Sequence, residues 1–172
     1  MKIRTGGPAD SAVMIELFDG AVRWLAGLGR TGQWGTSLAS ESPARREHFE
    51  EYARDMTVRV AETDDGRAVG VCVLVEEPPE SVSPAAEREL YIRLLLTDRA
   101  LKGGGIGAAL VADAREEAVR RGISLLRVDC YAGDDQALVR RYEALGFRRA
   151  ESFTVEREGL APWPGQVLGT RV

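Results

Sequence analysis

Four glycines crowd the junction between an apolar stretch and an amphipathic stretch past the middle of the chain. The apolar stretch ends at Thr97, Lys102 follows, and glycines then occupy positions 103, 104, 105 and 107. Helical spacing predicts a helix over 106–121, with Ile106, Leu110, Ala114 and Ala118 on one face. The unpaired N–H groups and partial positive charge of a helix N-terminus attract anions, and glycine lets the backbone approach them closely. The sequence therefore predicts a phosphate-binding turn.

Two common phosphate motifs fit this turn poorly. A mononucleotide P-loop places Lys-Ser or Lys-Thr after its last glycine, whereas here the lysine comes first and two alanines follow. The loose dinucleotide pattern fits Gly103, Gly105 and Ala108, with Asp129 as the ribose-binding acid. Only 43 residues follow Asp129, too few for the remaining parallel strands of such a sheet. A nucleotide-binding oxidoreductase is thus a disfavoured alternative.

Periodicity and turn residues divide the rest of the chain into short elements. Helices are expected at 10–28, at 42–54, at 106–121, and after Asp134 or Asp135 as far as Gly146. Strands are expected at 57–63, 68–76, 89–97, 123–131, 147–156 and 166–172, with a break at 162–165. No repeat or interdomain linker separates these elements. The sequence predicts one domain over residues 1–172.

Charge and composition argue against several functional classes. The net charge is −4 with no long run of one sign, which speaks against a nucleic-acid partner. No apolar run approaches the roughly 18 residues of a membrane span, so we expect no membrane partner and a cytoplasmic location. His48 is the single histidine, and Cys72 and Cys130 are isolated in apolar runs. We therefore expect neither a metal site nor a histidine-dependent nucleophile.

Two motifs resemble those of one family. The spacing of Lys102, Gly105 and Gly107 resembles the acetyl-CoA signature of the GCN5-related N-acetyltransferases (GNAT), in which an Arg or Gln usually stands at the first position. Downstream, Asp135, Tyr142 and Gly146-Phe147 resemble the family's second motif, where an asparagine usually occupies the first position. Lysine keeps the positive charge, whereas aspartate changes the expected contact with the coenzyme. Two motifs in this order form a specific signal.

The resemblance implies a fold and a cofactor. The fold would be α/β (α+β), a GNAT fold with a central mixed, mostly antiparallel, splayed seven-stranded sheet flanked by about four helices. Acetyl-CoA would be the co-substrate, with its pantetheine arm paired to the fourth strand and its pyrophosphate on the glycine turn. The implied cofactor-binding residues are Leu95, Leu96, Thr97, Lys102, Gly103, Gly104, Gly105, Ile106, Gly107, Ala108, Asp135 and Tyr142.

The resemblance also implies catalytic roles. Tyr142 is expected to act as the general acid for the departing thiolate, although its spacing alone favours a core aromatic. The backbone N–H near Leu95 is expected to stabilise the oxyanion. Glu89 is the expected catalytic carboxylate for deprotonating the substrate, with Asp129 and Asp134 left as alternatives. Substrate binding is expected from Trp34, Tyr91, Arg93 and Asp129, with Trp24, Gln33 and Trp163 as further specificity candidates.

The predicted activity is therefore an N-acetyltransferase that acts on a primary amine of a small molecule or peptide by direct attack in a ternary complex. The alternative is a non-catalytic acetyl-CoA sensor or regulatory module that keeps the same fold. A two-fold homodimer is common in the family and is the one protein partner that the resemblance suggests. The sequence does not identify the acceptor amine.

Overall fold

Seven strands and four α-helices form the chain, which a computed structural model describes over residues 1–172. The strands are β1 (Lys2–Thr5), β2 (Thr57–Glu62), β3 (Ala68–Val75), β4 (Leu90–Thr97), β5 (Leu125–Tyr131), β6 (Arg148–Val155) and β7 (Trp163–Arg171). The helices are α1 (Ser11–Gly27), α2 (Pro43–Asp55), α3 (Ile106–Arg120) and α4 (Ala137–Ala144). The strand order is β1-β2-β3-β4-β5-β7-β6, which confirms the predicted seven-stranded mixed sheet with four helices.

The chain divides into two compact units that share β4. Unit 1 comprises Met1–Leu74 and Leu94–Asp113, and unit 2 comprises Val75–Arg93 and Ala114–Val172. Within unit 2, β4 and β5 are parallel, and their pairing runs from Leu90 and Leu126 to Ile92 and Val128. Asp129 therefore follows the last paired position of β5.

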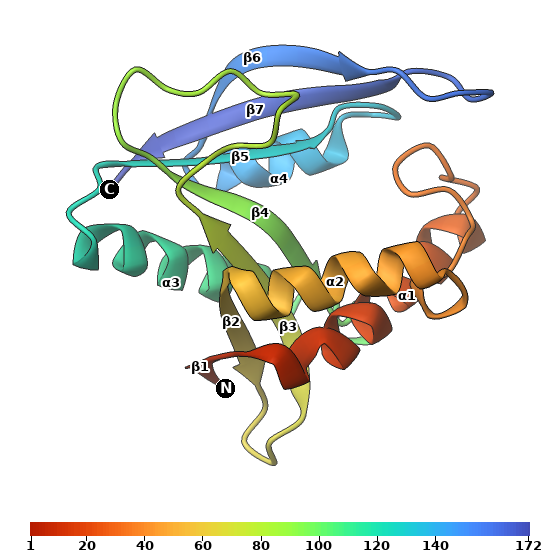
Figure 1. Cartoon of the computed structure of the whole chain (residues 1–172), viewed down its shortest axis with the longest axis horizontal. Coiled ribbons are helices and arrows are strands. Elements are labelled where there is room, and N and C mark those ends of the chain that lie inside the picture. Colours follow the sequence, from red (N-terminus) through yellow and green to blue (C-terminus); the bar gives the residue numbers. More distant parts are fainter. The chain divides into compact units, whose positions relative to one another are not determined.

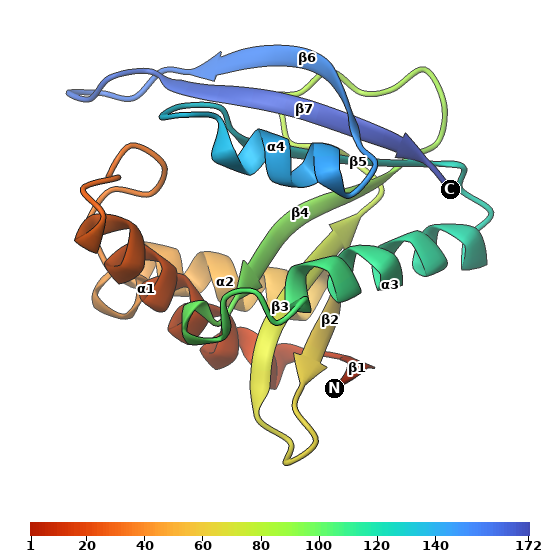
Figure 2. The same ribbon diagram turned by 180° about the vertical axis from the view of Figure 1, so that it is seen from behind.

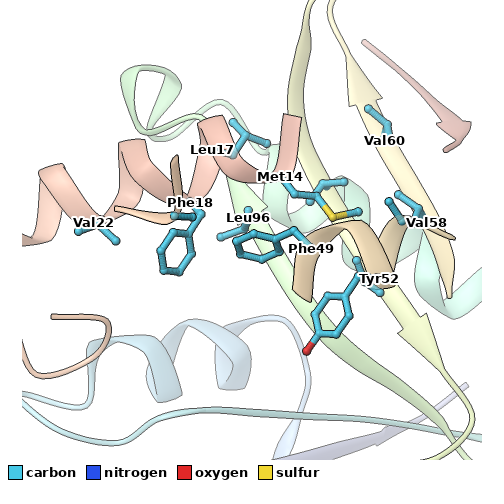
Figure 3. Close-up of a cluster of buried hydrophobic side chains, with 13 residues drawn as sticks. Met14, Leu17, Phe18, Val22, Phe49, Tyr52, Val58, Val60 and Leu96 are labelled. Atoms are coloured by element: carbon cyan, nitrogen blue, oxygen red, sulfur yellow. The ribbon is translucent and has the colours of Figure 1, made fainter. Parts of the chain in front are cut away.

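In unit 1, α1 and α2 pack side by side over one face of β2 and β3 (Figure 1). Ser42 accepts a hydrogen bond from the Arg45 amide and Pro43 is the first residue of α2, so the helix begins within one residue of the predicted range 42–54. In this core, the ring of Phe18 lies 5.4 Å from that of Phe49 (Figure 3). The ring of Trp34 packs against the cluster, 5.0 Å from that of Phe18. The buried cluster also contains Met14, Leu17, Val22, Tyr52, Val58, Val60, Val71, Val73 and Leu96.

Gly70 brings the first turns of α3 close to β3 in unit 1. A Cβ atom at this position would lie 2.6 Å from Cγ2 of Ile106 and 2.9 Å from Cδ1 of Leu110. Strand alternation directs Val71 to the side of α1 and α2, so α3 covers the opposite face. An ion pair between Arg59 and Asp113, 2.7 Å from Nε to Oδ2, also ties α3 to β2. The position of the glycine turn is thus set by packing of α3 on the sheet.

Unit 2 carries β5, β7 and β6 in that order, and α4 contacts β5 and β6 (Figure 2). The closing hairpin differs from the prediction, because β7 begins at Trp163 and includes Pro164 and Gly165. Pro164 has no N–H to donate, but its carbonyl accepts a hydrogen bond from the Ala132 amide at 2.9 Å. Residues 163–165 of the predicted break are therefore the start of a strand.

The N-terminal strand β1 is a further difference, because no strand is expected from the sequence at residues 2–5. It is four residues long and pairs antiparallel with β2, from Lys2 opposite Glu62 to Thr5 opposite Arg59. The other elements match their expected positions to within a few residues at each end. None of the helices combines the length and the hydropathy that crossing a bilayer requires.

Candidate functional site

The glycine turn leads from β4 into α3, entirely within unit 1. Asp98 accepts a hydrogen bond from the Ala100 amide and begins a 3₁₀ turn, Arg99–Leu101. Gly103 and Gly105 have φ angles of +88° and +73°, which favour glycine. The first helical hydrogen bond of α3 runs from the Ala109 amide to the Gly105 carbonyl at 2.9 Å. The amides of Ile106, Gly107 and Ala108 therefore lie in the first turn, ahead of any helical acceptor.

This turn is open to a ligand. Positions 101–105 are exposed, and a Cβ atom at Gly103 or Gly105 would meet no atom within 4 Å. The glycines are therefore not required by packing against the protein at these two positions. Together with the first-turn amides and the helix dipole, the open surface has the properties of an anion site.

Two cations and a tryptophan lie beside the turn. The guanidinium carbon of Arg99 lies 3.8 Å from the ring centroid of Trp24, and Nζ of Lys102 lies 5.2 Å from it. Trp24 comes from α1, so this helix positions both cations by cation–π contact. Lys102 is among the residues expected from the sequence and Arg99 is not. The signal for Arg99 is a second cation directly after β4.

In unit 2, Tyr91 and Asp129 meet across β4 and β5. The Tyr91 hydroxyl donates a hydrogen bond to Oδ1 of Asp129 at 2.7 Å. Tyr91 has no exposed surface, whereas Asp129 is partly exposed. Burial raises the pKa of the Asp129 carboxyl. The hydrogen bond from Tyr91 and the charge of Arg93 lower this pKa, but the effect of burial is larger. Burial and the Asp129 charge also raise the pKa of Tyr91, so the phenol keeps its proton.

Glu89 is occupied by structural contacts. Its side chain is 3% exposed and forms an ion pair with Arg127, in which Oε2 accepts from Nε and Oε1 accepts from Nη2 at 3.3 Å. Oε1 also accepts from the Ala85 amide at 3.2 Å, and Nη2 of Arg127 donates to the Ser83 carbonyl at 2.8 Å. The pair thus anchors the loop between β3 and β4, which favours a structural role for Glu89.

The second motif forms the start and the buried face of α4. Asp135 accepts a hydrogen bond from the Ala137 amide at 3.0 Å, and Gln136 adopts φ of +57° as the N-cap residue. Tyr142 is 6% exposed, and its ring packs edge-on against Phe147 at 5.6 Å between centroids. Gly146 follows with φ of +89° and ends the helix, as the sequence predicts.

The remaining predicted residues are distributed between the units. Trp34 lies in unit 1, partly buried against Phe18 in the core. Leu95 and Thr97 are partly buried and Leu96 is buried, all on the part of β4 that belongs to unit 1. Arg93 belongs to unit 2 and is partly buried.

The cysteines and the acidic side chains form no metal site. No group of three or more His, Cys, Asp or Glu side chains is placed to hold a metal ion. Both cysteines are buried and unpaired. Burial raises the pKa of the Cys72 thiol and raises that of Cys130 to about 12, so neither provides a ready thiolate.

Known proteins share the fold described above. Residues 23–147 match the model of the acetyltransferase (GNAT) family. No curated protein sequence matches the chain. Among solved structures, a ribosomal-protein-alanine N-acetyltransferase from Brucella melitensis is similar over 100% of both chains, with 23% identity and a TM-score of 0.70.

Two further structures share the fold. A putative acetyltransferase from Salmonella typhimurium, solved with its cofactor acetyl-CoA, has 19% identity and a TM-score of 0.67 over 99% of this chain and 93% of its own. A putative phosphinothricin N-acetyltransferase has 20% identity and a TM-score of 0.71 over 99% of this chain and 97% of its own.

Proposed function

The chain belongs to the acetyltransferase (GNAT) family, and from this premise we propose that it transfers the acetyl group of acetyl-CoA to a primary amine of a small molecule or peptide. The observation that carries the proposal is the open turn at Gly103–Ala108. Its first-turn amides precede the first helical hydrogen bond of α3, and two cations lie beside it. We further propose that residues 1–172 act as one acetyltransferase domain, since the similar structures cover 99–100% of the chain.

The turn fits the diphosphate of coenzyme A. The amides of Ile106, Gly107 and Ala108 would donate to the phosphate oxygens, and Lys102 would add a mobile positive charge. Open space at Gly103 and Gly105 lets the backbone approach the anion. Backbone groups of Leu95, Leu96 and Thr97 would pair with the pantetheine arm in the manner of an added strand. Bound acetyl-CoA supplies the thioester whose acetyl group is transferred.

The protein's own contribution to the chemistry is to orient, polarise and move protons. The Leu95 amide is proposed to stabilise negative charge on the acetyl oxygen, as fixed donors do in acyl transfer. Tyr142 is proposed to protonate the departing sulfur, because a phenol carries its proton at neutral pH. A neutral amine then needs no further activation once its ammonium proton has been removed.

A thermal-shift screen tests the proposed cofactor. A ligand that binds only the folded state stabilises it by about 2.7 kcal/mol at 100 times its Kd. We expect acetyl-CoA and free coenzyme A to raise the melting temperature and NADPH to leave it unchanged. A shift with NADPH alone would refute the proposal in favour of the nucleotide-binding alternative.

A second assay separates an enzyme from a non-catalytic acetyl-CoA sensor. Free thiol release from acetyl-CoA is followed with a panel of amines, and we expect it to depend on both substrates. The names of two similar structures, a ribosomal-protein-alanine and a phosphinothricin N-acetyltransferase, support an amine acceptor. Coenzyme binding without amine-dependent thiol release would identify a sensor. Light scattering on the same preparation tests the homodimer that the family resemblance suggests.

A further inference from the structure

Asp129 is held in place by a side chain of the neighbouring strand. Its Oδ1 accepts the Tyr91 hydroxyl at 2.7 Å, and the carboxyl also accepts a backbone hydrogen bond from its own residue. The side chain is partly exposed, and it follows the last paired rung of β4 and β5, formed by Ile92 and Val128. A partly exposed carboxylate in this position can accept a hydrogen bond from a ligand.

Three aromatic rings gather further along the same part of unit 2. The ring centroid of Trp163 lies 5.6 Å from that of Tyr131 and 6.1 Å from that of Phe153. All three side chains are only partly buried. Aromatic faces attract ammonium groups, and a carboxylate next to them adds the opposite charge.

The strand register places these rings and Asp129 on one face of the sheet. Asp129 and Tyr131 are two residues apart on β5, so their side chains point the same way. Across the ladder, Tyr131 and Phe153 both pair with Gly165, and Asp129 pairs with Val167. A Cβ atom at Gly165 would lie 2.3 Å from Cζ of Phe153, so the ring of Phe153 occupies the space above this glycine.

The charges that face Asp129 leave it able to hold a cation. On β4, Tyr91 donates its hydrogen bond and Arg93 contributes a positive charge. On β5, the guanidinium of Arg127 is taken up by Glu89. On β7, the residue paired with Asp129 is Val167, which does not titrate. Arg93 is therefore a cation that competes with a ligand for this carboxylate.

We propose that Asp129, with Tyr131, Trp163 and Phe153 beside it, forms the subsite for a cationic acceptor amine and that Asp129 removes the ammonium proton. The inference rests on the proposed function and deepens it by naming alkylammonium compounds as the acceptor class. An N–H bond of the ammonium breaks, and its proton passes to the Asp129 carboxylate. The neutral nitrogen then forms a bond to the acetyl carbon while the carbon–sulfur bond breaks. The nitrogen loses a second proton to solvent as the amide forms, and Tyr142, the proposed general acid, donates a proton to the departing sulfur.

Asp129 suits this role better than Glu89. Both oxygens of Glu89 are engaged by Arg127, and the side chain is 3% exposed. Asp129 is partly exposed, so a ligand can reach it. Its partial burial raises the pKa of the carboxyl, which makes the carboxylate a stronger base. The hydrogen bond from Tyr91 fixes the orientation of the carboxylate, so Tyr91 is a positioning residue.

The experiment compares an ammonium acceptor with a neutral one. Benzylamine, phenethylamine and n-butylamine are ammonium ions at pH 7, whereas aniline is neutral and needs no base. We expect Asp129→Asn to lower kcat/KM at least 100-fold for benzylamine and to change it less than threefold for aniline. The matched control is Glu156→Gln, which removes a negative charge from the β6–β7 hairpin at an exposed residue and should behave as wild type. Tetramethylammonium, a cation without an N–H, should compete with benzylamine.

The outcomes separate this inference from the proposed function. If coenzyme A does not raise the melting temperature of the wild-type protein, the proposed function itself is refuted. A normal thermal shift together with a benzylamine kcat/KM in Asp129→Asn within tenfold of wild type overturns only the present inference. A wild-type protein that binds coenzyme A but acetylates none of the three ammonium probes overturns it as well. Tyr91→Phe gives an independent readout, because loss of its hydrogen bond should move the acid limb of the benzylamine pH profile to higher pH.

Discussion

The Ala109 amide donates the first helical hydrogen bond of α3 to the carbonyl of Gly105 at 2.9 Å. Gly105 therefore ends the turn and begins the helix, with φ of +73°. Every amide between these two residues lies in the first turn and points toward the helix N-terminus. The proposed diphosphate site consists of backbone donors, so its test must remove a donor while leaving the side chains nearly unchanged.

The first prediction concerns Ala108, which is exposed and carries one of these amides. In Ala108→Pro the N–H is lost, while proline is tolerated in a first helical turn and the preceding Gly107 has no Cβ to clash. We expect coenzyme A affinity to fall by about 10- to 100-fold, the value of one hydrogen bond to a charged group. Isothermal titration measures this. Ala108→Ser keeps the N–H and should bind like wild type; equal binding by both variants would remove this amide from the site.

The second prediction concerns the contact between β3 and α3. Gly70→Ala places a methyl group 2.6 Å from Ile106 Cγ2 and 3.3 Å from the Leu96 carbonyl. The added methyl group fits only if α3 moves away from β3, so we expect a loss of about 1–3 kcal/mol in unfolding free energy. Gly20→Ala is the control, because a Cβ there meets no atom within 4 Å and a helix gains up to about 1 kcal/mol. Urea unfolding checks both, and unchanged stability of Gly70→Ala would show that α3 adjusts freely.

The third prediction tests the proposed general acid. Tyr142→Phe keeps the edge-on packing against Phe147 but loses the hydroxyl. We expect kcat to fall by about 10²- to 10⁴-fold, with coenzyme A affinity changed much less. Steady-state kinetics and titration give the two values. Tyr52→Phe, another buried tyrosine, is the control from the unit 1 core. A kcat for Tyr142→Phe equal to that of the control would assign Tyr142 to packing alone.

The fourth prediction concerns acid stability. Asp10 accepts hydrogen bonds from Arg4 at 2.7 Å and 3.1 Å and from the Gly7 amide at 2.8 Å. The hydrogen bonds from Arg4 hold the pKa of Asp10 below its ordinary value. Burial of the carboxyl raises this pKa and the hydrogen bond from the Gly7 amide lowers it, but the contribution of Arg4 is the largest. A lowered folded-state pKa contributes stability above the unfolded pKa of about 3.9, and this is lost as pH falls through the folded value.

Asp10→Asn should therefore be less stable than wild type by about 1–2 kcal/mol at pH 7, and the difference should shrink below pH 4. Chemical denaturation across this pH range measures it. A gap between the two proteins that stayed constant from pH 7 to pH 2 would contradict the assignment.

The site could be predicted in part because backbone-based recognition leaves a sequence pattern. Gly103 and Gly105 occupy positions that need positive φ, and Gly146 ends α4 in the same way. Periodicity and turn residues placed α2 and α3. Contacts between side chains left no such pattern. The stacking of Arg99 on Trp24 joins residues 75 positions apart, and neither local sequence indicates that the two side chains meet.

The sequence by itself determined the order of elements, the glycine turn and its adjacent lysine, because these depend on local propensity, φ requirements and spacing. Only the tertiary structure decided how strands pair. Four residues such as Lys2–Thr5 have too little propensity to form β1 without β2 to accept them, and Pro164 lies within β7 because its carbonyl finds a partner in Ala132. Pairing also set the chemistry of the carboxylates. Glu89 forms an ion pair with Arg127, whereas Asp129 accepts the Tyr91 hydroxyl and stays partly exposed. Strand register selects the neighbour of each carboxylate, and burial sets the energetic cost of leaving that carboxylate without a partner.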